Sequence, residues 1–170
     1  MSLKFTLAPA LGIWAISKQL RYPAQAEARP GPKFDAAVTL NPMFEKRFKR
    51  GEDNFVKRDR FICVTDGVGG WIRKLVDTGL FTKEYVVHVA DLYDKGEYAN
   101  LKELLDKASK MTKAKGSTTC VMAELKEGDF STLHTCNLGD SGYILLRPRN
   151  GKVDTVFKSE TQQHRFNAPY

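Results

Sequence analysis

The chain has 170 residues, of which 42% are hydrophobic and 28% charged, and this predicts one globular domain rather than a disordered or repeat-built chain. Its formal net charge of +7 is uneven, because residues 1–60 carry 12 Lys and Arg against 6 Asp and Glu, whereas residues 61–170 carry 15 against 14. The nearly neutral body argues against nucleic acid as a partner, and the basic cluster at residues 46–60 fits an anionic substrate such as a phosphoryl group equally well.

Residues 1–32 are predicted to form an N-terminal extension. Four basic residues accompany one acid, Glu27, around the apolar run Phe5–Ile16, which is broken by Pro9 and is too short to cross a bilayer. We therefore expect no stable membrane insertion, and the pattern is typical of an organelle-targeting presequence. A secretory signal is the rival, which three unpaired cysteines disfavour, and a disordered or simply packed extension is the other alternative. The Pro-Gly-Pro run at 30–32 marks the boundary to a domain at 33–170.

Beyond this boundary the pattern predicts two strands, two helices and then four more strands. The runs 34–40 and 55–65 are rich in β-branched and aromatic residues and are predicted strands. Apolar residues recur at helical spacing in Phe81–Tyr93 and in Leu101–Met111. Four short strands are predicted at 117–125, 130–138, 143–147 and 152–158. Asn150-Gly151 is a strong hairpin signal, because both residues tolerate positive φ, and the sum predicts a sheet-rich α+β domain.

Acidic residues stand beside glycines at the ends of these strands. Asp66-Gly67-Val68-Gly69-Gly70 ends the apolar run that begins at Phe61, with Glu52-Asp53 upstream and Asn137-Leu138-Gly139-Asp140 downstream. Hard divalent cations prefer oxygen ligands, and glycine lets a backbone carbonyl come close enough to serve as one. This pattern indicates a magnesium or manganese site. The GxGxxG and GxxxxGK spacings of nucleotide-binding loops are both absent.

The same residues resemble a known family, the metal-dependent serine/threonine phosphatases of the protein phosphatase 2C family. Its successive motifs are matched in order by residues 51–53 (GED), 66–71 (DGVGGW), 116–119 (GSTT) and 137–142 (NLGDSG). Three further features resemble the mitochondrial and plastid-type members: Val68, the stretch Pro42–Lys46 and the segment Ser159–Tyr170. The resemblance covers about residues 34–170, and it implies a mitochondrial location, with plastid or cytoplasm as alternatives.

The resemblance implies an αββα sandwich of two antiparallel sheets flanked by helices, with two or more Mg²⁺ or Mn²⁺ ions at one edge. It assigns Asp66, the Gly67 carbonyl and Glu52 to metal binding, Asp53 to a metal-bound water, and Asp140 to a third, weaker ion. The metals would activate a water molecule to attack the phosphate of phosphoserine or phosphothreonine in a protein substrate. Asp66, Glu52 and Asp53 are thus the predicted catalytic set.

The departures from the family pattern carry further expectations. Val68 stands where many members have a histidine that is proposed as general acid, and valine cannot donate a proton. Phe48 stands where the family has its phosphate-gripping arginine, so Lys49 or Arg50 is predicted to bind phosphate, with a solvated basic loop as the alternative. Family domains also continue beyond the segment 162–164 (QQH) and supply two further aspartates. The chain therefore resembles the N-terminal half to two-thirds of such a domain.

These departures leave three classes of function open. The first is a phosphatase. Because two of the family's metal ligands are missing from this chain, we expect such an enzyme to bind Mn²⁺ weakly. The second is a catalytically weak or inactive phosphatase-like protein that binds phosphopeptides or regulates a partner. The third is a metal-binding scaffold. In a shortened sandwich we also expect a partner chain to cover the exposed sheet edge.

Overall fold

An antiparallel sheet of four strands forms the centre of the computed structural model, which describes residues 31–42, 44, 48, 51–126, 128, 132–165 and 168–169. The strands run in the order β1 (Asn54–Arg58), β2 (Phe61–Thr65), β3 (Cys120–Leu125) and β4 (Leu133–Leu138). Buried and partly buried residues alternate along β3, as expected where one face of a sheet is packed and the other is more open. The predicted extension at residues 1–32 lies almost entirely outside the described residues.

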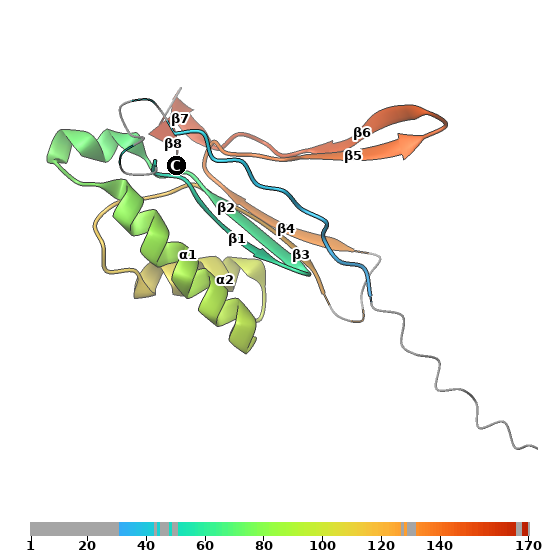
Figure 1. Cartoon of the computed structure of the whole chain (residues 1–170), viewed down its shortest axis with the longest axis horizontal. Helices are drawn as coiled ribbons and strands as arrows, with labels where there is room; N and C mark the ends of the chain where they lie inside the picture. Colours follow the sequence, from blue (N-terminus) through green and yellow to red (C-terminus); the bar gives the residue numbers. More distant parts are fainter. Residues whose placement is uncertain are drawn as a thin grey trace, which may run out of the picture. The chain divides into compact units, whose positions relative to one another are not determined.

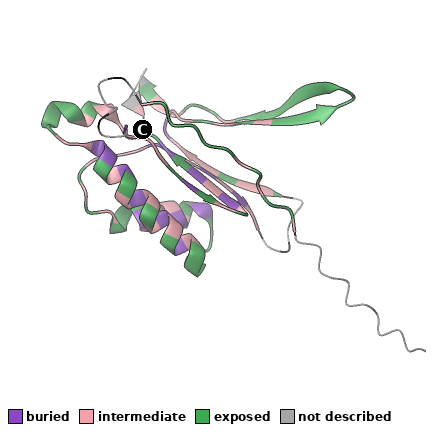
Figure 2. Ribbon diagram, viewed as in Figure 1, coloured by how far each residue is buried: buried purple, intermediate pink, exposed green. Residues whose placement is uncertain are grey.

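Two helices cover the packed face of this sheet, α1 (Thr78–Lys95) and α2 (Leu101–Met111) (Figure 1). Each helix buries one stripe of side chains, and Figure 2 marks buried positions on both helices and on the strands of the sheet. The core consists of Val56, Phe61, Cys63, Cys120 and Met122 from the strands, with Tyr85, Val89, Leu92, Leu101, Leu104 and Ala108 from the helices. None of the helices in the described part of the chain combines the length and the apolar character that a membrane crossing requires.

The helix ends follow local sequence signals. The side chain of Asp77 caps the start of α1 by accepting from the amide of Gly79, and Gly96 ends that helix with a left-handed φ of 67°. Asn100 caps α2 by accepting from the amide of Glu103. These signals are local, so both predicted helices are confirmed, α2 with identical bounds and α1 with a few more residues at each end.

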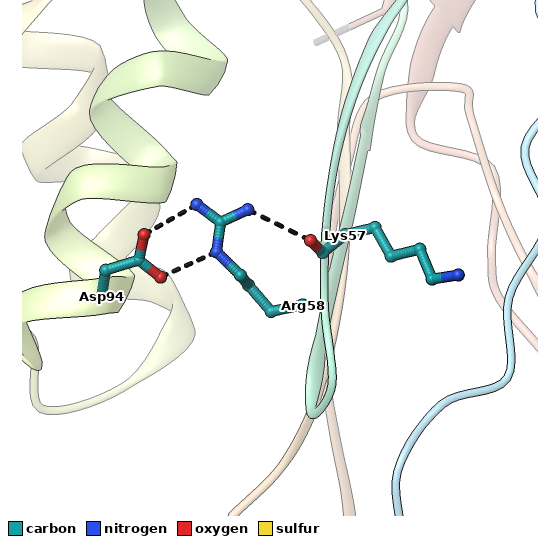
Figure 3. Close-up of polar contacts among 3 residues, drawn as sticks. All are labelled: Lys57, Arg58 and Asp94. Carbon is teal, nitrogen blue, oxygen red and sulfur yellow. Dashed lines mark hydrogen bonds and ion pairs between the residues drawn. The ribbon is translucent and has the colours of Figure 1, made fainter.

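An ion pair on the surface joins the end of β1 to the last turns of α1 (Figure 3). Arg58 donates from Nε to Oδ1 of Asp94 at 2.8 Å and from Nη2 to Oδ2 at 2.7 Å. A third bond runs from Nη1 of Arg58 to the carbonyl of Lys57 at 3.1 Å. This pair lies at the far end of β1 from Glu52 and Asp53, so it fixes the helix against the sheet away from the predicted site.

A 3₁₀ helix and four further strands complete the described elements. The 3₁₀ helix, η2 (Gly69–Lys74), lies between β2 and α1, and the four strands follow β4. β5 (Ile144–Arg149) and β6 (Lys152–Lys158) form a hairpin of their own, and β7 (Gln163–Arg165) pairs with β8 (Ala168–Pro169). Asn150 and Gly151 both have positive φ, 50° and 75°, which confirms the predicted hairpin turn.

Three strand predictions need correction. Residues 34–40 form no strand, because a strand requires a partner and this segment is attached at isolated points, through the amide of Phe34 on the carbonyl of Asp59 and Lys57 on the carbonyl of Ala36. The predicted strand 55–65 is two strands, since the pairing of Arg58 with Phe61 closes a two-residue turn. The strand predicted from Ser117 begins only at Cys120, because the residues before it turn toward Asp66.

Candidate metal centre

Asp66 lies directly after β2, where hydrogen bonds from the GSTT segment fix its backbone. Its carbonyl accepts from the amide of Thr119 at 2.9 Å and from the hydroxyl of Thr118 at 2.9 Å, and its amide donates to Oγ1 of Thr119 at 3.3 Å. The next residues continue this contact, because Gly67 forms an isolated bridge with Thr118 and the amide of Val68 donates to the carbonyl of Ser117 at 3.0 Å. Two of the predicted motifs therefore lie side by side and set the direction of the Asp66 side chain.

Gly67 brings the segment that contains Glu52 against this strand end. A Cβ atom on Gly67 would lie 3.0 Å from Cβ and from the carbonyl oxygen of Glu52, and 3.0 Å from Cγ2 of Thr78. This spacing is tighter than ordinary van der Waals contact, so glycine permits an approach that a larger residue would prevent. The structure thus places Glu52 beside Gly67, as the motif order predicted for two residues of one site.

Buried threonines of α1 hold the Glu52 backbone in place. Thr82 is fully buried, and its hydroxyl donates to the carbonyl of Glu52 at 2.7 Å while accepting from Nδ2 of Asn54 at 2.7 Å. Thr78, also fully buried, donates to the carbonyl of Ser117 at 2.9 Å. The first turns of α1 therefore tie together the two segments on either side of Gly67.

Trp71 anchors the glycine turn that follows Asp66. Its indole Nε1 donates to Oγ of Ser117 at 2.8 Å, and Lys74 lies over its ring at 4.9 Å from the centroid. This hydrogen bond holds the indole ring against the GSTT segment and so connects the turn to that segment.

The segment that carries Asp140 reaches the same place from β4. Oγ1 of Thr119, which also accepts from the Asp66 amide, lies 2.6 Å from Oγ of Ser141, the residue after Asp140. Gly139 is buried with a φ of 91°, and a Cβ there would lie 2.8 Å from Cγ2 of Thr119. Thr119 is thus the common contact of the Asp66 and Asp140 segments.

Four acidic residues consequently act on one another. Although part of its surface is exposed, Asp66 is crowded by the sheet end, and this partial burial is the main reason that its pKa rises from 3.8 to about 6. A hydrogen bond with Asp53 and the negative charges of Asp53, Asp140 and Glu52 raise the same pKa further. The acidic residues predicted to form the site are therefore brought together, and each contributes to the potential at Asp66.

The donor set is the one that a hard divalent cation prefers, because it consists of carboxylates and a glycine carbonyl. A cation would also relieve the repulsion that raises the pKa of Asp66. In the described part of the chain, however, no three His, Cys, Asp or Glu side chains already stand close enough together to enclose an ion. The residues fit an oxygen-coordinated cation in chemistry, and binding requires their side chains to close around it.

Some residues of this site were missed from the sequence, and some predicted ones fall outside the structure. Thr82 holds the Glu52 segment by a hydrogen bond, and no motif identifies it. Ser141 and Gln162 lie within the quoted motifs at 137–142 and 162–164, but the motifs gave no role to their contacts with the Asp66 and Asp140 segments. Lys49 and Arg50, the predicted phosphate ligands, lie outside the described residues. Phe48, which stands where the family has its arginine, is 96% exposed.

Similarity to known proteins agrees with this site. No family model matches the chain. It is 41% identical over 134 residues to probable protein phosphatase 2C 80 of Arabidopsis thaliana, a match that covers 76% of this chain and 31% of that protein. It is also 41% identical over 114 residues to the protein phosphatase PTC7 homolog fig of Drosophila mojavensis, covering 63% of this chain and 35% of that protein.

Among solved structures, the X-ray structure of the photosystem II phosphatase PBCP matches with a TM-score of 0.68 and 31% sequence identity. The match covers 78% of this chain and 51% of that one. The four-stranded antiparallel sheet and its two helices therefore belong to the part of the fold that the chain shares with this phosphatase structure. Over the part that it matches, the chain is similar to members of the protein phosphatase 2C family, and the predicted resemblance and α+β fold class are confirmed. It spans about a third of the length of these two curated relatives.

Proposed function

We propose that this chain carries the Asp66 side of a metal-dependent serine/threonine protein phosphatase site. The observation that carries the proposal is the convergence at Asp66: Gly67 is packed against Glu52, Thr119 contacts both the Asp66 and the Asp140 segments, and burial together with three neighbouring carboxylates raises the Asp66 pKa. Three segments that are distant in sequence would thus supply the oxygen ligands of one cation site.

Asp66, Glu52, the Gly67 carbonyl and Asp140 would hold Mg²⁺ or Mn²⁺ ions, two or more in number. When bound, such ions supply a water nucleophile of lowered pKa and neutralise charge on the phosphoryl oxygens. Asp53, which is hydrogen-bonded to Asp66, would hold and orient the water of the site. Val68 has no proton to give, so the leaving serine or threonine oxygen takes its proton from solvent or from another group.

The substrate we propose is a phosphoserine or phosphothreonine in a protein. The names of the relatives support this class, since they are called protein phosphatases. Lys49 or Arg50 would contact the phosphate, because their fixed positive charge complements its negative charge. We further propose an organellar location, mitochondrial with plastid as the alternative. The likeness to the PTC7 homolog and to a photosystem II phosphatase supports a branch of this kind.

A second candidate is a phosphatase-like protein that binds phosphopeptides or a partner chain with weak turnover or none. One observation favours it: among the described residues no three acidic or other metal-binding side chains yet form a cage. Turnover depends on the cation, whereas peptide binding does not, so side chains that are not gathered around a cation favour binding over turnover.

A single set of titrations tests the proposal. Mn²⁺ is added to the wild type, to Asp66→Asn and to Asp91→Asn, a matched control that removes the same charge from an exposed position of α1. Binding is followed by calorimetry, and phosphate release is followed with a phosphothreonine peptide. We expect saturable binding that weakens at least about 10-fold in Asp66→Asn and is unchanged in Asp91→Asn.

The outcomes separate the candidates. Mn²⁺-dependent phosphate release that is lost in Asp66→Asn supports the phosphatase, whereas peptide binding without release supports the second candidate. If the wild type shows no saturable Mn²⁺ binding, or if the two Asn variants behave alike, the metal site is refuted.

A further inference from the structure

Gln162 makes three hydrogen bonds to the segment that carries Asp140. Its amide donates to the carbonyl of Gly139 at 2.9 Å, its Oε1 accepts from the amide of Gly139 at 3.3 Å, and its Nε2 donates to the carbonyl of Asn137 at 3.2 Å. One residue therefore binds both backbone groups of the residue that directly precedes Asp140.

These bonds replace a strand partner that the segment lacks. Pairing between β3 and β4 ends at Cys120 with Leu138, so Gly139 lies just beyond the last rung of the ladder. Gly139 is buried, and a buried backbone group without a partner is costly, so its amide and carbonyl require partners from elsewhere. Gln162 supplies both, and a neighbouring bond from Nδ2 of Asn137 to the carbonyl of Glu160 at 3.1 Å ties down the same stretch.

The Gly139 turn is also confined from the opposite direction. A Cβ at Gly139 would lie 2.8 Å from Cγ2 of Thr119 and 3.2 Å from Cβ of Pro169, which shows how closely both neighbours approach. With Thr119 in contact and Gln162 hydrogen-bonded, the backbone that enters Asp140 has little freedom. Asp140 follows this backbone directly, and its negative charge is near enough to Asp66 to contribute to the raised pKa of that residue.

We infer that Gln162 is a positioning residue for the cation site, which acts by holding the Asn137–Gly139 backbone so that Asp140 faces Asp66; this inference rests on the function proposed above. A glutamine side chain suits the role because it carries one acceptor for the Gly139 amide and donors for the Asn137 carbonyl. A carboxylate would lack the donor and a lysine would lack the acceptor. Ligand-supporting residues of this kind typically change metal affinity by about 10–100-fold when they are removed.

The test compares Gln162→Met with Gln163→Met. Both changes replace an amide by a thioether of similar length, but no hydrogen bond of the Gln163 side chain is present among the described residues. Mn²⁺ affinity is measured by calorimetry at a temperature where every variant is folded. Hydrogen exchange of the 137–141 backbone is measured without metal. We expect Gln162→Met to weaken the weakest resolved Mn²⁺ binding event by about 10-fold and to speed exchange at Gly139, with Gln163→Met like the wild type.

The outcomes are distinct. If Gln162→Met lowers the melting temperature but binds Mn²⁺ as the wild type does, Gln162 is merely structural and the inference is refuted. Equal loss in both variants refutes it as well. If the wild type itself does not bind Mn²⁺, the proposed function has failed, and the inference falls with it. Should Gln162→Met not fold, Gln162→Asn keeps the amide but withdraws it by one methylene, and the same loss of affinity is expected.

Discussion

The tight packing of Gly67 against Glu52 predicts a sharp difference between two alanine substitutions in the same turn. In Gly67→Ala the new Cβ would meet three atoms at 3.0 Å, the Cβ and carbonyl oxygen of Glu52 and Cγ2 of Thr78. In Gly70→Ala the new Cβ would meet nothing within 4 Å. Neither glycine has a positive φ, so both positions accept an alanine backbone and the difference between the variants reports the contacts alone.

The magnitude follows from two opposing effects. Overpacking of a closely filled site costs about 1–3 kcal/mol, whereas replacing glycine by alanine stabilises by about 0.4–1 kcal/mol through the unfolded chain. Gly70→Ala should therefore be neutral or slightly stabilising. Gly67→Ala should lie about 1–3 kcal/mol below it in unfolding free energy, which for a domain of this size is about 2–10 °C in melting temperature.

Urea denaturation of both variants and the wild type measures the difference, and Mn²⁺ calorimetry measures its effect on the site. Glu52 has to move by a few tenths of an ångström to admit the new methyl group, so we expect weaker Mn²⁺ binding in Gly67→Ala and unchanged binding in Gly70→Ala. If the two variants are equally stable, the close approach of Gly67 and Glu52 does not exist in solution. If they differ in stability but bind Mn²⁺ alike, Glu52 is not a ligand.

Three other substitutions test the charge and the packing of the molecule. Folding raises the pKa of Asp66 from 3.8 to about 6, so protonation of Asp66 stabilises the metal-free protein fully below about pH 4, and this stabilisation is lost as the pH rises through about 6. Denaturation at several pH values should show the fall in unfolding free energy. In Asp66→Asn the unfolding free energy should depend less on pH. Leu104→Ala leaves a cavity at a fully buried position of α2 and should lower the unfolding free energy by about 2–5 kcal/mol, as measured by urea denaturation. A smaller decrease in unfolding free energy would mean that the helix is not packed on the sheet. Asp94→Asn breaks an ion pair whose side chains are 39% and 47% exposed, so it should cost no more than about 1 kcal/mol, and a larger loss would show that the pair is a principal support of α1.

The helices were predictable because their signals are local. Apolar spacing and the caps Asp77, Asn100 and Gly96 all lie within or next to the helix concerned, and they fix its bounds whatever surrounds it. The run 34–40 has strand-like residues but forms no strand, since strand formation depends on a partner elsewhere in the chain. For the same reason, the predicted strand 55–65 is two paired strands, and the turn between them contains no Gly or Asn that would mark it in the sequence.

The acidic residues proposed for the site could be named from the sequence because they lie in the ordered motifs, but the residues that hold their backbones could not. Thr82 and Gln162 hold Glu52 and Gly139 across separations of 30 and 23 residues, through single side chains that any loop or helix can contain. These two residues can support the site because, in the folded chain, a backbone carbonyl or amide lies within hydrogen-bonding distance of their side chains. Sequence spacing does not encode that position, so hydrogen-bonding residues of this kind become visible only in the structure.

The arrangement around Asp66 has a cost that cation binding can reverse. Burial first, then a hydrogen bond with Asp53 and the charges of Asp53, Asp140 and Glu52, raise the pKa of Asp66 to about 6, so at neutral pH a partly buried carboxylate is ionised where other negative charges repel it. Gly67 leaves no space behind Glu52, and Thr119 is in contact with both the Asp66 and the Asp140 segments. A divalent cation replaces that repulsion by attraction to every carboxylate and binds only the folded state, so each tenfold excess over its dissociation constant adds about 1.4 kcal/mol of stability. If the proposed site is correct, the negative charges that destabilise the metal-free protein are the same ones that would bind a divalent cation, so stability and ion binding should change together when Mn²⁺ is added.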